Sequence, residues 1–325
     1  MCVCEQSSSA NFGGSTPNAF GVDAKRSVGF VCHRFRRGGQ AVERPIRQSS
    51  GGQRARLQKR PHEKERSGVR IAIIESPGID YEWKDGGEEW SAPWGSSEAQ
   101  WFGAIFPRIS EYLPAGTTLE IGPGFGRWTH YLKEHCERLH VVDPDPRCIE
   151  ACRRRFGDDS RLTYHVNDGR CLAMIADRSI DFVFSFDSMV HVPRELVEAY
   201  LRQLADKLTD DGVGFIHHSN LGEHASSFGR RLPERARKLL TKAKLLDQDH
   251  QRAPDMTAEL FQSFSAAQGL RCLHQELINW RGRRLIDCFT TFARAGSRWA
   301  SSSTTIRNPN FMREARLIRK GRKWG

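Results

Sequence analysis

The stretch Leu119-Glu-Ile-Gly-Pro-Gly-Phe-Gly-Arg-Trp-Thr129 decides the fold of this chain. A short apolar run ends in three glycines at alternate positions, Gly122, Gly124 and Gly126, and a segment compatible with a helix follows from Arg127. Glycine has no Cβ atom and adopts positive φ angles readily, so such a turn can lie flat against a small molecule. The stretch therefore predicts a strand, a tight ligand-binding turn and a helix.

Strand-like and helix-like segments alternate after this turn. Apolar runs at 139–143, 162–166, 180–186 and 213–217 are separated by helical patterns at 127–136, 146–156 and 194–207. Such alternation is typical of a parallel sheet with helices on both faces. Two further strands, 270–279 and 285–292, are joined by Trp280-Arg-Gly-Arg-Arg284, which predicts a hairpin. We predict an α/β fold with a seven-stranded, mostly parallel sheet that ends in an antiparallel hairpin.

The basic residues are concentrated at the two ends of the chain. The net charge is +11, yet residues 69–296 carry 29 Lys and Arg against 33 Asp and Glu. A folded nucleic-acid reader usually carries its basic stripe on the domain itself, so we do not expect nucleic acid as the partner. We predict a disordered basic extension over 1–68, a globular domain over 69–296 and a basic tail over 297–325, in which 311–324 could form an amphipathic helix.

Two segments of the predicted domain stand apart from this alternation. The Trp-rich segment 83–113 is either a lid over the glycine turn or a helix that covers the edge of the sheet, and residues 219–255 form a polar insertion. No apolar run approaches the roughly 20 residues that span a bilayer, so we expect a soluble, cytoplasmic protein without a membrane span. The nine cysteines contain no Cys-x-x-Cys pair, and we expect no structural metal.

The glycine turn departs from the dinucleotide-binding fingerprint G-x-G-x-x-G, because Arg127 stands where the third glycine is required. The pattern Glu120-x-Gly122-x-Gly124-x-Gly126 instead resembles motif I of the class I S-adenosylmethionine-dependent methyltransferases, and the later elements agree over about residues 97–295. The resemblance implies a Rossmann-like fold, S-adenosyl-L-methionine as the cofactor and methyltransferase activity of class EC 2.1.1.-.

The resemblance also implies which residues hold the cofactor. The glycine turn would accommodate its aminoacid end, and Glu120 would either orient that turn or meet the ammonium group. Asp143 would accept the ribose hydroxyls, although an Asp before Pro can simply form a turn. Asp168, with Gly169, would contact the adenine, although Asn-Asp-Gly can also be turn chemistry alone. Asp187, after the fourth strand, would lie by the methionine moiety or the substrate.

Transfer of a methyl group to a hydroxyl requires alignment and a base that removes the proton. His191 follows the fourth strand, and His217 and His218 end the fifth strand at the same rim. We expect His191 to be the general base and His217 or His218 to orient or replace it. The alternative is that His191 only packs at the start of a helix and that the other two are rim residues.

The residues directly after the fourth strand constrain the methyl acceptor. Family members that methylate amino groups often carry Asn/Asp-Pro-Pro-Tyr/Phe there, whereas this chain has Ser185-Phe-Asp-Ser188. The difference favours O-methylation of a small molecule, a saccharide being one candidate. Two other hypotheses are an RNA methyltransferase that uses the basic tails and a binding module that keeps the fold without catalysis.

Overall fold

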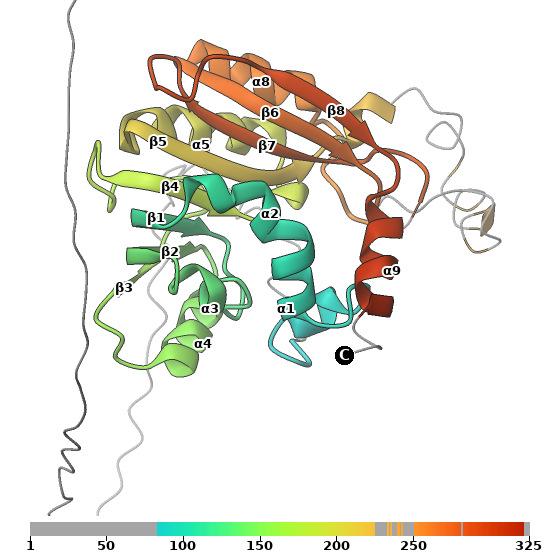
Figure 1. Ribbon diagram of the computed structural model, residues 1–325, viewed down its shortest axis with the longest axis horizontal. Helices are drawn as coiled ribbons and strands as arrows, with labels where there is room; N and C mark the ends of the chain where they lie inside the picture. The colour runs from blue at the N-terminus through green and yellow to red at the C-terminus, as the bar shows by residue number, and fades with distance from the viewer. Residues whose placement is uncertain are drawn as a thin grey trace, which may run out of the picture. The chain divides into compact units, whose positions relative to one another are not determined.

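The computed structural model describes residues 83–224, 250–280 and 282–321, and also 233, 235, 239, 240 and 242. The predicted extension 1–68 and most of the predicted insertion 219–255 lie outside the described residues. One sheet has the strand order β3-β2-β1-β4-β5-β7-β6-β8 (Figure 1). Its strands are β1 Ala115–Ile121, β2 Cys136–Asp143, β3 Leu162–Val166, β4 Ile180–Ser185, β5 Leu208–Ser219, β6 Leu270–Ile278, β7 Asp287–Arg294 and β8 Thr304–Asn308.

The pairing of the strands confirms the predicted α/β fold. The first five strands pair in parallel, and β7 is antiparallel to both β5 and β6. The continuous apolar character of β4 has the expected cause, since Phe182, Val183 and Phe184 are all fully buried between layers of helices. The sheet differs from the prediction in having eight strands instead of seven.

The eighth strand corrects the prediction of a basic tail over 297–325. β8 pairs in parallel with β6, and α9 (Phe311–Gly321) follows it and packs against α1 and η2. Phe311 and Ala315 are buried on the inner face of α9, whereas Arg316 and Lys320 are exposed. Burial of that apolar stripe holds the helix on the domain, and the basic residues occupy the opposite, solvated side.

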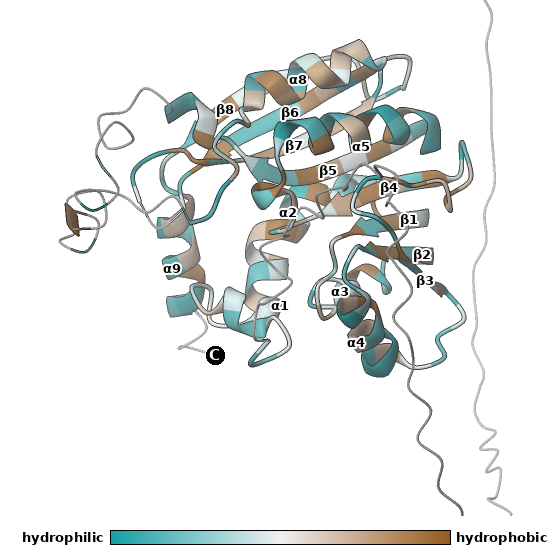
Figure 2. Ribbon diagram, turned by 180° about the vertical axis from the view of Figure 1, so that it is seen from behind, coloured by the Kyte–Doolittle hydropathy of each residue, from teal (hydrophilic) through white to brown (hydrophobic). Residues whose placement is uncertain are grey.

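Helices cover both faces of the sheet. α5 and α8 lie side by side on the face seen in Figure 2. α5 turns Val197, Leu201 and Leu204 toward the sheet, and the hydroxyl of Thr257 caps α8 by accepting from Leu260 N. The helices are α1 Ser97–Gln100, α2 Phe106–Ile109, α3 Thr129–Leu132, α4 Pro146–Phe156, α5 Arg194–Lys207 and α8 Ala258–Ala267, and the shorter or wider turns are η1 Glu88–Ser91, η2 Trp101–Ile105, η3 Ser110–Tyr112, η4 Met189–His191 and η5 Leu221–His224.

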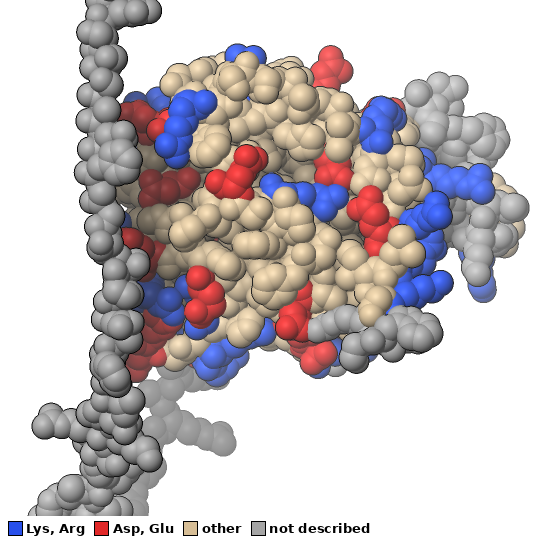
Figure 3. Space-filling model, viewed as in Figure 1, with Lys and Arg blue, Asp and Glu red and all other residues tan. Residues whose placement is uncertain are grey.

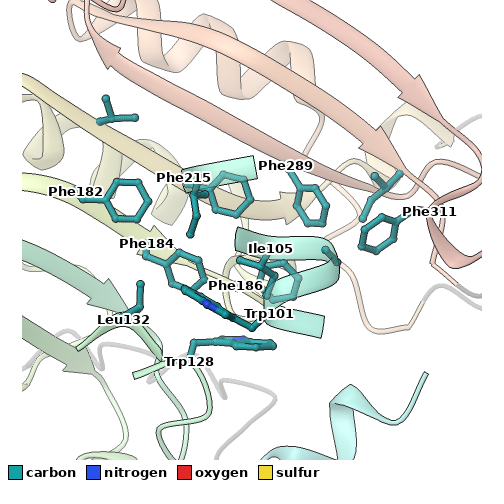
Figure 4. Packing of buried hydrophobic residues seen from close by; sticks show 14 of the residues in the cluster. Trp101, Ile105, Trp128, Leu132, Phe182, Phe184, Phe186, Phe215, Phe289 and Phe311 are labelled. Carbon is teal, nitrogen blue, oxygen red and sulfur yellow. The ribbon is translucent and has the colours of Figure 1, made fainter. Parts of the chain in front are cut away.

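The opposite face carries an aromatic core that includes much of the predicted lid. Trp101 stacks on Tyr131 with ring centroids 5.2 Å apart, and Phe184, Phe215 and Phe289 continue the cluster across the sheet (Figure 4). Trp94 and Trp101 are 0% exposed, and Ile105 and Ile109 do not exceed 1%. Side chains so deeply buried cannot swing outward without opening the core. Residues 94–113 are therefore a fixed wall, and the lid hypothesis is restricted to residues 83–91.

Candidate functional site

The predicted site residues come together at one edge of the sheet. Because β1 to β5 are parallel, their carboxyl ends meet there, and the order reverses between β1 and β4, where ligands bind in open α/β sheets. The antiparallel β7 begins at the same edge, with Asp287 opposite Ser219 of β5. Ile278 of β6 and Asn308 of β8 complete this row of residues. Residues from distant parts of the domain therefore lie along one edge of the sheet.

The glycine turn, residues 122–126, has the backbone that its sequence predicts. The φ angles of Gly122, Gly124 and Gly126 are 73°, 57° and 85°. A Cβ atom at Gly122 would lie 2.0 Å from Ser188 Oγ, and one at Gly124 would lie 2.5 Å from the Trp83 ring. Only glycine fits both the conformation and the space, so Ser188 and Trp83 can lie directly against the backbone of the turn.

Trp83 lies directly against the glycine turn. Its ring stacks on that of Phe125, with centroids 4.6 Å apart and planes 13° from parallel. The contact brings the first described residue of the Trp-rich segment onto the backbone that the resemblance assigns to the cofactor. The residue that lies against the turn is therefore Trp83, and not one from the buried wall 94–113.

Glu120 is buried at the end of β1 and anchors the helix after the turn. Its Oε2 accepts a hydrogen bond from Thr129 Oγ1 at 2.5 Å, while Oε1 has no partner among the described residues. Burial raises the pKa of Glu120 to about 8. A carboxyl group with one unpartnered buried oxygen can still accept a donor, so both expected roles of Glu120 remain chemically open.

Asp143 ends β2 and is only 7% exposed. Its Oδ1 accepts from the backbone N–H of Asp145 at 2.8 Å, which is the turn chemistry that its position before a proline suggested. Burial raises the pKa of Asp143 to about 7. Asp143 is thus a desolvated carboxyl group that has acceptor capacity left and whose ionisation would be favoured by donors from a ligand.

Asp168 is exposed and organises its own turn. Its Oδ1 accepts from the backbone N–H groups of Arg170, at 2.9 Å, and Cys171, at 2.7 Å, and these bonds lower its pKa. Gly169 has a φ angle of 78°, and its N–H donates to Asn167 Oδ1. The turn lies beside Asp143, because Asn167 N donates to the Asp143 carbonyl at 3.2 Å. The two strand ends that would hold the ribose and the adenine are therefore neighbours.

Asp187 is engaged by side chains on two sides. It has a φ angle of 63°, which is uncommon for a residue other than glycine. Its Oδ2 accepts from Arg127 NH2 at 2.7 Å, and its Oδ1 lies 3.3 Å from His217 Nδ1. Burial raises the pKa of Asp187, but the hydrogen bond of His217 and the charge of Arg127 outweigh it and hold the pKa far below its usual value.

His217 continues this contact into the core. Its Nε2 lies 3.3 Å from Asp287 Oδ2, an ion-pair contact without hydrogen-bond alignment, and Asp287 receives two hydrogen bonds from Arg252, at 2.9 and 2.8 Å. Burial lowers the pKa of His217, but its contacts with Asp187 and Asp287 outweigh burial and raise it. We call Arg127, Asp187, His217, Asp287 and Arg252 the charge network.

Three members of the charge network were missed by sequence reasoning. Arg127 was noticed only as a departure from a glycine pattern, Arg252 lies in the predicted insertion and Asp287 begins a hairpin strand. Arg252 and Asp287 are 35 positions apart in the chain, and the contact of Asp287 with His217 depends on the antiparallel register of β5 and β7. No local pattern predicts that register.

His191 lies in η4, directly after β4. Its Nδ1 is 2.9 Å from the carbonyl oxygen of Gln251. A carbonyl can only accept, so Nδ1 carries the proton and Nε2 keeps its lone pair. Burial, together with the positive charge of Arg252, lowers the pKa of His191, which favours the neutral imidazole. This is the protonation state that a general base requires.

His218 does not belong to the site, which corrects its assignment beside His217. Successive side chains of a strand point to opposite faces, and His218 stacks on Phe261 of α8 with centroids 4.4 Å apart. Its Nε2 lies 2.8 Å from Thr290 Oγ1, and burial lowers its pKa to about 4. His217 is on the correct face but is fully buried, so neither histidine is an exposed rim residue.

Membrane-spanning helices and metal clusters do not occur in the described part of the chain. Among those residues, no helix is both long and apolar enough to cross a membrane. Within the same residues, no group of three or more His, Cys, Asp or Glu side chains is arranged to hold a metal ion.

Comparison with known proteins gives matches to one family model, to curated proteins and to solved structures. Residues 118–212 match the family model described as a methyltransferase domain. The chain is 28% identical over 165 residues to phosphoethanolamine N-methyltransferase 2 of Caenorhabditis elegans, covering 49% of this chain and 36% of that relative. It is 36% identical over 55 residues to nodulation protein S of Rhizobium tropici, covering 17% and 23%. The matched regions thus span about a third or less of these relatives.

A solved structure of similar arrangement is that of an S-adenosylmethionine-dependent methyltransferase from Mesorhizobium loti. It is 18% identical to this chain, with a TM-score of 0.44, and the match covers 60% of this chain and 98% of that one.

Proposed function

We propose, from the premise that residues 118–212 of this chain form a class I methyltransferase domain, that the protein transfers the methyl group of S-adenosyl-L-methionine to a hydroxyl group of a small molecule. The observation that carries the acceptor chemistry is the tautomer of His191, whose Nε2 lone pair is available at the same edge as the glycine turn. A saccharide is one candidate acceptor, and calorimetry with S-adenosyl-L-methionine tests the cofactor part directly.

The residues at the carboxyl edge fit this cofactor. The glycine turn lacks the Cβ atoms that would hold a ligand away from the backbone, and Asp143 retains capacity to accept from the ribose hydroxyls. Glu120 keeps one oxygen without a described partner for the aminoacid end. S-adenosyl-L-methionine supplies a methyl group on a sulfonium that is already a good leaving group, so the protein mainly has to align the acceptor.

Asp187 takes a different role in this proposal from the one first expected. Arg127 and His217 already engage both of its oxygens, so it holds the glycine turn against the fourth and fifth strands. Trp83 and the residues up to Ser91 are the proposed cover over the turn. His191 would accept the proton of the acceptor hydroxyl at Nε2 as the new C–O bond forms.

Replacing His191 with glutamine should lower turnover by about 10²- to 10⁴-fold, because general-base catalysis contributes on that order. Affinity for S-adenosyl-L-methionine should stay unchanged, because no contact assigned to the cofactor involves this side chain. The measurement is the initial rate of label transfer from radiolabelled S-adenosyl-L-methionine into a cell extract, with calorimetry of the cofactor in parallel. His130→Gln, which changes an exposed histidine of α3, is the matched control. A His191 variant within a few-fold of the parent would remove the base assignment.

Cofactor affinity should rise with pH as Asp143 and Glu120 ionise, and level off above about pH 8. Asp143 has a pKa of about 7 in the free protein, and the ribose hydroxyls require its ionised form as acceptor. Below that pKa, Asp143 must release a proton before it can bind the cofactor. The dissociation constant should therefore rise about tenfold for each unit by which the pH is lowered. Calorimetry with S-adenosyl-L-methionine between pH 5.5 and 8.5 measures this. In Asp143→Asn the slope should fall by about one proton and keep only the contribution of Glu120, whose pKa is about 8, and a slope equal to that of the parent would contradict the assignment.

A further inference from the structure

A pocket lies at the same edge of the sheet as the charge network. It has a volume of about 500 Å³ and is lined by Pro93, Asn279, Gly282, Met312, Arg316, Arg319 and Lys320. The pocket and the charge network are connected through Trp280. Asn279 precedes Trp280, whose ring lies 5.6 Å from that of His217 and 5.1 Å from the guanidinium carbon of Arg252. We call it the α9 pocket.

The α9 pocket is strongly positive. Three of its seven lining residues are Lys or Arg and none is acidic. Figure 3 shows basic side chains gathered on this side of the molecule, over α9. No carboxylate among the described residues pairs with Arg316 or Lys320. The acid of the helix, Glu314, instead pairs with Arg108 and Asn308.

The arrangement of these cations is unfavourable without an anion. Arg316 and Lys320 are four residues apart and therefore lie on one side of α9, where like charges destabilise a helix. The helix dipole favours cations in the last turn, which accounts for Arg319 and Lys320 but not for Arg316. A bound anion would remove the repulsion and supply the missing partner for both side chains.

The pocket is held on rigid elements. Asn279 Nδ2 donates to the Gly282 carbonyl at 2.6 Å, and Asn279 Oδ1 accepts from Met312 N at 3.3 Å. These bonds join the turn after β6 to the start of α9, which is anchored in the core by Phe311. The volume falls in the range of small-molecule sites, and the cations occupy one helix face without extending into a stripe along the domain. Both features favour a small anion over a nucleic acid.

We propose that the α9 pocket binds a phosphate monoester, the anionic part of the methyl acceptor. This inference rests on the proposed function and narrows its substrate class. Arg316 and Lys320 would hold the phosphate oxygens, and the remainder of the acceptor would extend past Trp280 toward His191. A planar guanidinium and an ammonium on one face suit a tetrahedral dianion better than a neutral sugar.

The test is calorimetry on the full chain with glycerol 3-phosphate, with glycerol as the neutral match. Glycerol 3-phosphate should bind and glycerol should not. Arg316→Gln should weaken the binding of glycerol 3-phosphate about tenfold or more, because a charge-assisted hydrogen bond is lost. Arg313→Gln removes the same charge from an exposed position of α9 outside the pocket and should leave the affinity unchanged. No binding by the parent, or equal weakening in both variants, would overturn the proposal.

Two further arms identify the source of the phosphate. Vesicles that contain phosphatidic acid and bind only through Arg316 would support the site and assign the phosphate to a lipid headgroup. An RNA oligonucleotide that binds with steep salt dependence and equal sensitivity to Arg313 would overturn it. S-adenosyl-L-methionine is titrated into the same samples. If S-adenosyl-L-methionine binds and glycerol 3-phosphate does not, only this inference is contradicted. If glycerol 3-phosphate binds and S-adenosyl-L-methionine does not, the proposed function is contradicted.

Discussion

Gly122→Ala should weaken S-adenosyl-L-methionine binding by at least about 100-fold, the largest effect that we expect from a single methyl group. The new Cβ would lie 2.0 Å from Ser188 Oγ and 2.4 Å from Ser188 Cβ, against about 3.5–4.0 Å for carbon atoms in contact. The turn must shift by more than an ångström, and its backbone N–H groups then point away from the ligand. Calorimetry with S-adenosyl-L-methionine measures the loss.

Two variants separate this clash from simple backbone strain. Gly157 has a φ angle of 62°, and a Cβ atom added there would meet no other atom within 4 Å, so Gly157→Ala carries similar strain without a clash. It should bind the cofactor as the parent does. Adding Ser188→Gly to Gly122→Ala removes the two atoms that clash and should restore much of the affinity. If Gly157→Ala were as damaging, or if the double variant gained nothing, the close approach at Gly122 would not be the cause.

Asp287→Asn should lower the free energy of unfolding by about 3–5 kcal/mol, because it leaves Arg252 with its charge buried and unpaired. Arg252 is 6% exposed; its Nε and NH2 donate to the Asp287 carboxylate, and its NH1 donates to the neutral carbonyl of His250. His217 loses the second of its two flanking carboxylates in the same variant. Urea unfolding followed by tryptophan fluorescence measures the change in stability.

The control for Asp287 is another Asp–Arg pair of the same chain at the surface. Asp210 pairs with Arg178, with 90% and 51% of their side chains exposed. Asp210→Asn should cost no more than about 1 kcal/mol, as is usual for exposed pairs. The double variant Arg252→Met, Asp287→Leu should recover part of the lost stability, since apolar side chains of similar size need no ionic partner. Equal costs for Asp287→Asn and Asp210→Asn would show that burial of the network contributes nothing.

The cradle of the site could be predicted because its information is local. Glycines at alternate positions after an apolar run specify a strand followed by a left-handed turn, and the acids Asp143 and Asp168 follow strands in the expected order. The opposite directions of His217 and His218 were also within reach, since neighbouring residues of a strand cannot share a face. The alternation puts His217 beside Asp187 and His218 against Phe261, so the prediction that both lie at the site was wrong for His218.

The rest depends on pairing between distant segments. His217 reaches Asp287 only because β7 is antiparallel to β5, and Gln251 reaches His191 from the end of an insertion 60 residues away. The sequence predicts a tail at the C-terminal end because basic residues dominate that region and only a few apolar residues anchor α9. Phe311 and Ala315 supply that anchor, and neither stands out against the surrounding arginines.

The wall that borders the proposed acceptor site joins the two ends of the described chain, which has a consequence for the order of folding. Arg319 donates to the Ala92 carbonyl across 227 positions, and Trp94 packs on Phe311 with ring centroids 5.7 Å apart. The glycine turn is closed by contacts over shorter separations, such as the 60 positions between Arg127 and Asp187, whereas longer loops close more slowly. A nascent chain could therefore form its cofactor-binding turn before the neighbouring α9 pocket exists. The packing of α9 against the segment around Trp94 would be the last step.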